Sequence, residues 1–149
     1  MSDGTSKVRL SGRCLCGGVA FKTPLPHHID ICHCETCRRW NGGPFIGIDI
    51  REDIEFEASE SLTWYKSSEW AQRGFCNICG ASLFYRLKAQ PNFWSIAGGA
   101  VDLPEGLSVA KEIFVDEKPD YYQFAGNHPR LTGEEAFAAF AAEDAEMSQ

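Results

Sequence analysis

The sequence has no long apolar segment and no excess of positive charge. Its longest apolar run, residues 136–142, has seven residues, five of them alanine, whereas a membrane-spanning helix needs about 20. Basic residues number 14 against 21 acidic ones, which leaves a net charge of −7. Nucleic acids and anionic membranes are bound through clustered basic side chains, so we expect neither as a partner. Residues 1–10 lack the apolar core of an export signal, and we therefore expect a cytoplasmic protein.

Internal repeats, low-complexity tracts and Pro- or Ser-rich linkers are also absent. A chain of 149 residues without such boundaries is expected to form one compact domain. A chain of this size buries roughly 68–70% of its unfolded surface, so it does not need a metal or a disulfide merely to collapse. Any metal that it binds is therefore available to serve a function as well.

Short segments of alternating polarity predict a mostly β chain, because alternation is typical of half-buried strands. No strand–helix alternation supports a parallel sheet. One helical turn is expected at 35–40, ended by Gly42 and Gly43. Thr132 and Glu135 have the spacing of a capping box, which predicts a short C-terminal helix. Strands are expected in 8–22 on either side of a turn at 14–18, and at 29–31, 45–50, 54–57, 62–65, 71–75, 83–86, 93–96 and 109–115.

All seven cysteines fall into close-spaced clusters. In a reducing compartment such clusters indicate metal or redox chemistry more often than disulfides, and an odd number cannot pair completely. A short spacing lets one tight turn direct two sulfurs to a common point, as a tetrahedral zinc site requires. The repeated steps of a ferredoxin iron–sulfur motif are absent, so the sequence predicts zinc. The clusters are Cys14-x-Cys16, Cys32-x-Cys34-x-x-Cys37 and Cys76-x-x-Cys79.

The spacing permits two divisions of these ligands. A conventional zinc ribbon would combine Cys34 and Cys37 with the pair at 76 and 79. The other division places Cys14, Cys16, Cys76 and Cys79 in one site and Cys32, Cys34 and Cys37 in another. We favour the second, because a four-sulfur site is closed and structural, whereas three ligands leave a position open for catalysis. The three-cysteine site could also be closed by His33 or another side chain, which would make it structural. In extended chain, however, the His33 ring should point away from the flanking sulfurs.

These motifs resemble the glutathione-dependent formaldehyde-activating enzyme family, which includes the centromere protein V branch. The resemblance covers about residues 8–122, most of the chain. Its motifs are Cys14-x-Cys16-Gly17, Cys32-His33-Cys34-x-x-Cys37-Arg38-Arg39, Phe75-Cys76-x-x-Cys79-Gly80, Gly99-x-x-Asp102 and Phe114-Val115-Asp116-Glu117-Lys118-Pro119. Ala100 and Val101 depart from the family pattern, and the chain after Tyr122 does not match it.

The resemblance implies a small single-domain zinc-bearing fold of twisted antiparallel sheets, a β-tent with two zinc ions. The family domain would span 8–122, and 123–149 would be a C-terminal extension whose helix packs on the same domain. The structural zinc would be held by Cys14, Cys16, Cys76 and Cys79, and the catalytic zinc by Cys32, Cys34 and Cys37. The family's activity is a carbon–sulfur lyase reaction, which joins formaldehyde and glutathione to S-hydroxymethylglutathione and also runs in reverse. Glutathione would therefore be the co-substrate.

Addition of a thiol to an aldehyde needs a thiolate and a polarised carbonyl, and an open zinc site supplies both. We expect the substrate thiol to enter the fourth position or to displace one of the three cysteines. Arg38 and Arg39 are candidates for binding a glutathione carboxylate, although surface salt bridges are the ordinary alternative. Trp40 is a candidate for the wall of the substrate pocket, although most aromatic residues are core residues. The remaining candidates are proton carriers or pocket walls that ordinary loop or core positions also explain: His27, His28, His128, Trp64, Trp70 and Trp94.

Two other classes of function fit the same residues. One is a non-catalytic, zinc-stabilised binding module, and the other is a thiol-based redox or metal-handling protein. Two zinc ions of which one exchanges with a mild chelator would indicate the enzyme. Two inert zinc ions would indicate the binding module.

Overall fold

The computed structural model describes residues 8–147, and side chains up to Glu143. The chain divides into two compact units. Unit 1 combines the chain up to Ile29 with Ile46–Ser108, and unit 2 combines Asp30–Phe45 with the chain from Val109 onward. Each unit contains one of the two groups of cysteines.

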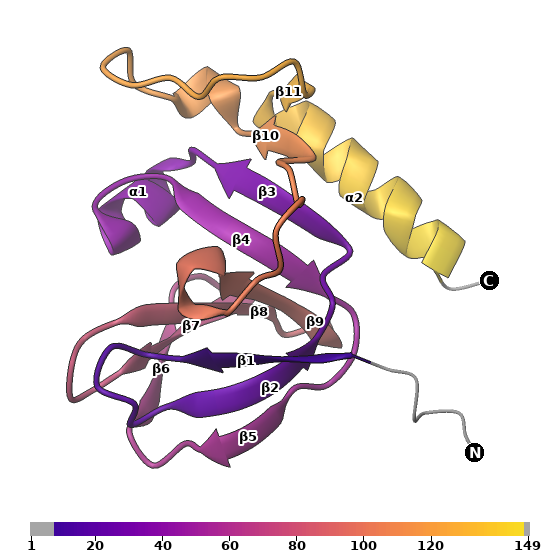
Figure 1. Ribbon diagram of the computed structural model, residues 1–149. Helices are drawn as coiled ribbons and strands as arrows, with labels where there is room; N and C mark the ends of the chain where they lie inside the picture. Colours follow the sequence, from indigo (N-terminus) through magenta and orange to yellow (C-terminus); the bar gives the residue numbers. More distant parts are fainter. Residues whose placement is uncertain (1–7, 148–149) are drawn as a thin grey trace. The chain divides into compact units, whose positions relative to one another are not determined.

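Unit 1 contains two antiparallel β-layers. The smaller layer has the strand order β1-β2-β5, and Figure 1 shows these three strands side by side. The larger layer has the order β4-β9-β8-β7-β6. The strands are β1 (Arg9–Arg13), β2 (Ala20–Pro24), β4 (Phe45–Ile50), β5 (Glu55–Ala58), β6 (Leu62–Lys66), β7 (Ala71–Cys76), β8 (Ser82–Leu87) and β9 (Gln90–Ala97), with a 3-10 turn η2 (Gly98–Ala100) after β9.

The core of unit 1 lies between apolar faces of these strands. Phe21 and Phe84 are fully buried, and their rings meet edge to face at 5.1 Å. Trp94 packs on Phe84 at 5.4 Å in the same way. Edge-to-face packing is a preferred arrangement of aromatic rings. Trp64 joins this cluster through Trp94, at 6.0 Å between ring centroids, so both tryptophans are core residues.

Unit 2 contains short parallel strands and two helices. The strands β3 (His28–Cys32), β10 (Lys111–Ile113) and β11 (Arg130–Leu131) run in the order β3-β10-β11. Helix α1 (Glu35–Asn41) follows β3, a 3-10 turn η3 (Val115–Glu117) follows β10, and helix α2 (Gly133–Met147) follows β11. In Figure 1, α2 lies against β10 and β11. Lys111 forms ion pairs with Asp30 on β3 and Glu143 on α2, which tie these elements together.

The mostly β fold and the C-terminal helix predicted from the sequence are confirmed. The capping box also forms: the Thr132 N–H donates to Glu135 Oε1 at 2.8 Å, and the Glu135 N–H donates to Thr132 Oγ1 at 3.2 Å. Gly42 ends α1 in a left-handed conformation, with φ 77°, as expected of a glycine stop.

Antiparallel pairing holds throughout unit 1, but the three strands of unit 2 are parallel. Alternation within a strand carries no information about the direction of a partner that is distant in the sequence, so the pattern could not show this. The two-residue strand β11 is too short to produce any alternation. The expected boundary between 8–122 and 123–149 stays a prediction. No helix in the described part of the chain has both the length and the apolar character that a membrane span requires.

Candidate metal centres

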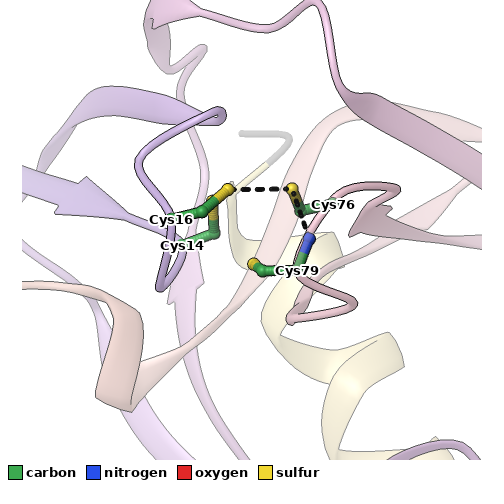
Figure 2. Close-up of side chains that lie close together, drawn as sticks. All are labelled: Cys14, Cys16, Cys76 and Cys79. Carbon is green, nitrogen blue, oxygen red and sulfur yellow. Dashed lines mark hydrogen bonds between the residues drawn. The ribbon is translucent and has the colours of Figure 1, made fainter.

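The first candidate centre is formed by two turns of unit 1 that face each other (Figure 2). One turn joins β1 to β2 and carries Cys14 and Cys16. The other joins β7, which ends at Cys76, to β8 and carries Cys79. The four sulfurs lie within 4.8 Å of one another. The Sγ atom of Cys16 is 3.7 Å from that of Cys14 and 3.6 Å from that of Cys76. Four sulfurs at about 2.3 Å from a tetrahedral zinc ion would be about 3.8 Å apart, so the group fits zinc. A disulfide would require about 2.05 Å.

Both turns are built so that backbone N–H groups point at the sulfurs. Gly17 and Gly80 hold φ angles of 81° and 80°, a left-handed conformation that glycine adopts without a steric penalty. The N–H groups so directed donate to sulfur at 3.3–3.5 Å, from Val19 to Cys14, from Gly18 to Cys16, and from Ile78 and Cys79 to Cys76. These donors offset the negative charge of thiolates and therefore favour a metal-binding state.

The thiols of this centre differ in acidity before any metal binds. Hydrogen bonds from the Cys79 N–H and the Ser61 hydroxyl lower the pKa of Cys76 to about 6, although burial opposes this. The Gly18 N–H lowers the pKa of Cys16, but burial and hydrogen bonds with the neighbouring thiols outweigh it and raise that pKa to about 11. Metal binding must displace the remaining protons, as is usual for thiolate sites.

The second candidate centre lies in unit 2, where β3 meets α1. Cys32 is the last residue of β3, Cys34 caps the helix in an extended conformation, and Cys37 lies one turn further along. Their three sulfurs also lie within 4.8 Å of one another. The Cys37 N–H donates to Cys34 Sγ at 3.3 Å. Hydrogen bonds with the Cys34 and Cys37 thiols, together with burial, raise the pKa of Cys32 well above its ordinary value.

This second centre is a group of three. Among the described residues, no histidine, aspartate, glutamate or fourth cysteine joins it. Cys32 and Cys34 are half-buried and Cys37 is buried, so solvent reaches the group. A thiolate set of this kind suits zinc, and three protein ligands with one position left over are typical of catalytic zinc sites. The residues present therefore fit the metal that the sequence predicts.

His33, between two of these cysteines, is directed away from them. Its Nδ1 atom lies 2.9 Å from the Tyr122 hydroxyl and its Nε2 atom lies 2.8 Å from Glu112 Oε1. Both ring nitrogens are thus occupied, and the side chain is fully buried. The geometry contradicts the alternative in which His33 closes the site.

The structure separates the two candidate arginines. Arg38 is half-buried, and its Nε atom donates to the His33 carbonyl at 3.0 Å. Arg39 pairs with Glu35 on the surface at 2.8 Å, with the two side chains 78% and 61% exposed. No carboxylate pairs with Arg38 within the described part of the chain. Trp40, in the same helix, is half-buried.

None of the other histidine candidates joins a sulfur group. His27 is exposed, and His28, the first residue of β3, is half-buried; neither joins a sulfur group. Trp70 is 60% exposed. His128 belongs to unit 2, and its Nε2 atom lies 2.5 Å from Glu112 Oε2.

Sequence reasoning missed Glu112 and Tyr122. Glu112 is buried at the centre of β10 and accepts hydrogen bonds from His33, His128 and Arg130. Burial raises the pKa of Glu112, but these donors outweigh it and lower that pKa overall, so the carboxyl group is ionised. Glu112 was hard to identify from the sequence, because a single polar residue in a short strand is only a weak indication of a functional role. Its contact with His33 spans 79 positions and therefore leaves no local sequence pattern.

Comparisons with known proteins show which family the chain resembles in sequence. The model of the family described as glutathione-dependent formaldehyde-activating enzyme matches residues 9–117. An uncharacterised lyase of Schizosaccharomyces pombe is 30% identical over 125 residues, which are 83% of this chain and 91% of the relative. A Halomonas elongata protein, named as a candidate glutathione-dependent formaldehyde-activating enzyme, is 25% identical over 126 residues, with 76% and 80% covered.

A solved structure supports the fold. The crystal structure of a Rhodobacter sphaeroides protein superposes with a TM-score of 0.52 and 23% sequence identity. The match covers 80% of this chain and 98% of that one. At this identity the likeness concerns the fold alone.

Proposed function

The chain belongs to the glutathione-dependent formaldehyde-activating enzyme family, and we propose that it is a zinc-dependent carbon–sulfur lyase. The reaction would join a thiol to an aldehyde at the three-cysteine site, and it would also run in reverse. Glutathione and formaldehyde, which give S-hydroxymethylglutathione, are the proposed substrates. The observation that carries the proposal is the group of three converging thiols to which no fourth metal-ligating residue is added in the described chain.

The reaction needs no oxidant or reductant. The thiol loses its proton, and its sulfur forms a bond to the aldehyde carbon. The π electron pair of the C=O bond moves to oxygen, which takes up a proton and becomes the hydroxyl of the product. When bound, a zinc ion would favour the thiolate form of the substrate or polarise the aldehyde oxygen.

The three cysteine thiolates bias the site toward sulfur chemistry. Their combined charge of −3 exceeds the +2 charge of zinc, and this makes the site a poor activator of water. Exchange of a sulfur ligand is therefore a more natural use of the site than hydrolysis. The half-buried positions of Cys32 and Cys34 leave them accessible to a small thiol.

Arg38 is the residue proposed to bind a carboxylate of glutathione. Its cationic side chain is close in sequence to Cys37, is half-buried, and is held through Nε by the His33 carbonyl. A guanidinium group fixed in this way presents its remaining donors for two-point binding of a carboxylate. Arg39 is instead engaged by Glu35, so we assign it no part in binding.

Exchange spectroscopy by NMR tests the proposal. The protein is added to formaldehyde and glutathione at equilibrium, and the rate of exchange between free formaldehyde and the thiol adduct is measured. We expect acceleration by the wild-type protein and none by the folded Cys34→Ser variant. An exchange rate equal to the uncatalysed one would remove formaldehyde and glutathione as substrates. Retention of two inert zinc ions as well would favour the binding module.

A further inference from the structure

The chain beyond the matched family region contacts His33, which lies between two of the three cysteines. The family model ends at residue 117, and all three cysteines precede that point. The His33 ring contacts Tyr122 and Phe124, which follow residue 117, and its partner Glu112 also binds His128. We propose that His33 is a positioning residue for the three-cysteine site and that Glu112 and Tyr122 hold it in place. This inference rests on the proposed function of that site.

Every polar atom of His33 is hydrogen-bonded. Its backbone N–H donates to the Ile113 carbonyl at 3.1 Å, and its carbonyl accepts from Arg38 Nε at 3.0 Å. The two ring nitrogens are hydrogen-bonded to Tyr122 and Glu112. Backbone and ring are thus fixed together, and the residue cannot turn without breaking several of these bonds.

The two flanking cysteines depend on this fixation. Cys32 ends β3 and Cys34 is extended. Their sulfurs converge with that of Cys37, whereas the His33 ring is directed to Tyr122 and Glu112. A rotation of the His33 backbone would swing both sulfurs away from Cys37. The buried contacts of the His33 ring therefore keep the Cys32 and Cys34 thiols close to Cys37.

The hydrogen-bond directions follow from Glu112. Its Oε2 atom accepts from His128 Nε2 and from Arg130 Nε, the latter at 3.1 Å, so its carboxylate charge is compensated. A carboxylate can only accept, hence His33 Nε2 carries the proton that is donated to Oε1. When Nδ1 carries no proton it is an acceptor, and the Tyr122 hydroxyl, 2.9 Å away, is then its donor. The Tyr122 ring also stacks on the His33 ring, at 5.5 Å and 26°.

Segment 122–130 is itself anchored to this cluster. The Arg130 side chain donates through Nη2 to the carbonyls of Phe124 and Gly126, at 2.8 and 3.1 Å. The Phe124 ring lies 6.0 Å from that of His33. One guanidinium group therefore binds both the loop and Glu112, so the loop and the buried carboxylate hold His33 as one assembly.

The test measures zinc affinity by competition with a chromophoric chelator. The three-cysteine site is identified as the one absent from Cys34→Ser. Groups that orient metal ligands typically contribute 10- to 100-fold to metal affinity. We expect Tyr122→Phe, which removes one hydroxyl, to weaken zinc binding at this site about tenfold. Tyr121→Phe is the matched control, because Tyr121 is 79% exposed, and it should change the affinity less than about twofold.

Two substitutions at His33 distinguish the effect of its hydrogen bonds from the effect of its size. His33→Leu should weaken the site about 100-fold. His33→Gln keeps a donor near the Nε2 position toward Glu112 but lacks the Nδ1 atom that contacts Tyr122. Its zinc affinity should therefore be higher than that of His33→Leu and equal to that of Tyr122→Phe. The four-cysteine site should keep its affinity in all variants. Equal affinities for Tyr122→Phe and Tyr121→Phe, no recovery in His33→Gln, or equal loss at both sites would each overturn the inference.

Failure of this inference can be distinguished from failure of the proposed function. If the wild-type protein binds two zinc ions and accelerates exchange while Tyr122→Phe behaves like Tyr121→Phe, only the positioning role is wrong. If the wild-type protein binds no zinc at the three-cysteine site, both are wrong.

Discussion

Glu112 Oε1 lies 2.8 Å from His33 Nε2, and neither side chain is more than 1% exposed. The two residues are 79 positions apart in the sequence. An unpaired carboxylate in such surroundings would be costly, but Glu112 is compensated by Arg130 and two histidines. This pair joins β10 to the segment that carries the three cysteines, and it makes that segment a fixed element of unit 2.

The two sulfur groups should respond differently to loss of one ligand. Cys76→Ser removes a ligand from the closed group, whose metal would contribute directly to folding, so we expect a lower melting temperature and loss of one zinc ion. Cys34→Ser should also lose one zinc ion but keep a melting temperature close to that of the wild type. Thermal unfolding and native mass spectrometry measure both properties. Variants that melt alike and both retain two zinc ions would refute our division of the ligands.

Arg38 and Arg39 form a matched pair for testing substrate binding. Arg38→Ala should raise the KM for glutathione about tenfold, with a smaller change in kcat, because it removes a contact made equally in the ground and transition states. Arg39→Ala removes only the exposed pair with Glu35, which is typically worth about 0.3–0.5 kcal/mol in stability, and should leave KM unchanged. Steady-state kinetics at varied glutathione concentrations measure KM and kcat for both variants. A KM that rises in Arg39→Ala but not in Arg38→Ala would reverse the assignment.

The left-handed glycine of the second cysteine turn should not tolerate a side chain. An added Cβ at Gly80 meets no atom within 4 Å, but the φ angle is +80°, and a left-handed conformation costs other residues about 1–2 kcal/mol. Gly80→Ala should lower the free energy of unfolding by that amount and weaken zinc binding at the four-cysteine group. Gly43 has equal space without a left-handed φ, so Gly43→Ala is the control.

Urea denaturation of the two glycine variants provides the measurement. Gly43→Ala should be neutral or stabilising by up to about 1 kcal/mol, because alanine restricts the unfolded chain. If Gly80→Ala is as stable as Gly43→Ala, backbone conformation does not limit that turn.

Local patterns predicted the features whose causes are local. The β1 and β2 strands, the stop of α1 at Gly42, and the hydrogen bonds of Thr132 with Glu135 each depend on residues that are close in the sequence. The two groups of sulfurs that the structure brings together are the two that the favoured division named. Their division into a structural and a catalytic site stays a proposal.

Long-range contacts account for what could not be predicted. The parallel pairing of Asp30 with Lys111 joins distant segments, and no pattern within either segment specifies it. The bond between Glu112 and His33 depends on that pairing. By contrast, the Glu35–Arg39 pair has the i, i+4 spacing of a helical ion pair, so the sequence did contain a signal that Arg39 was engaged.

The most direct test of the central claim is an absorption titration of the protein with cobalt(II) in the three-cysteine site and zinc in the other. If the site admits a substrate thiol, glutathione should increase the sulfur-to-cobalt charge-transfer absorption until it saturates, and S-methylglutathione should not. A cobalt spectrum that stays constant at all glutathione concentrations would contradict the account.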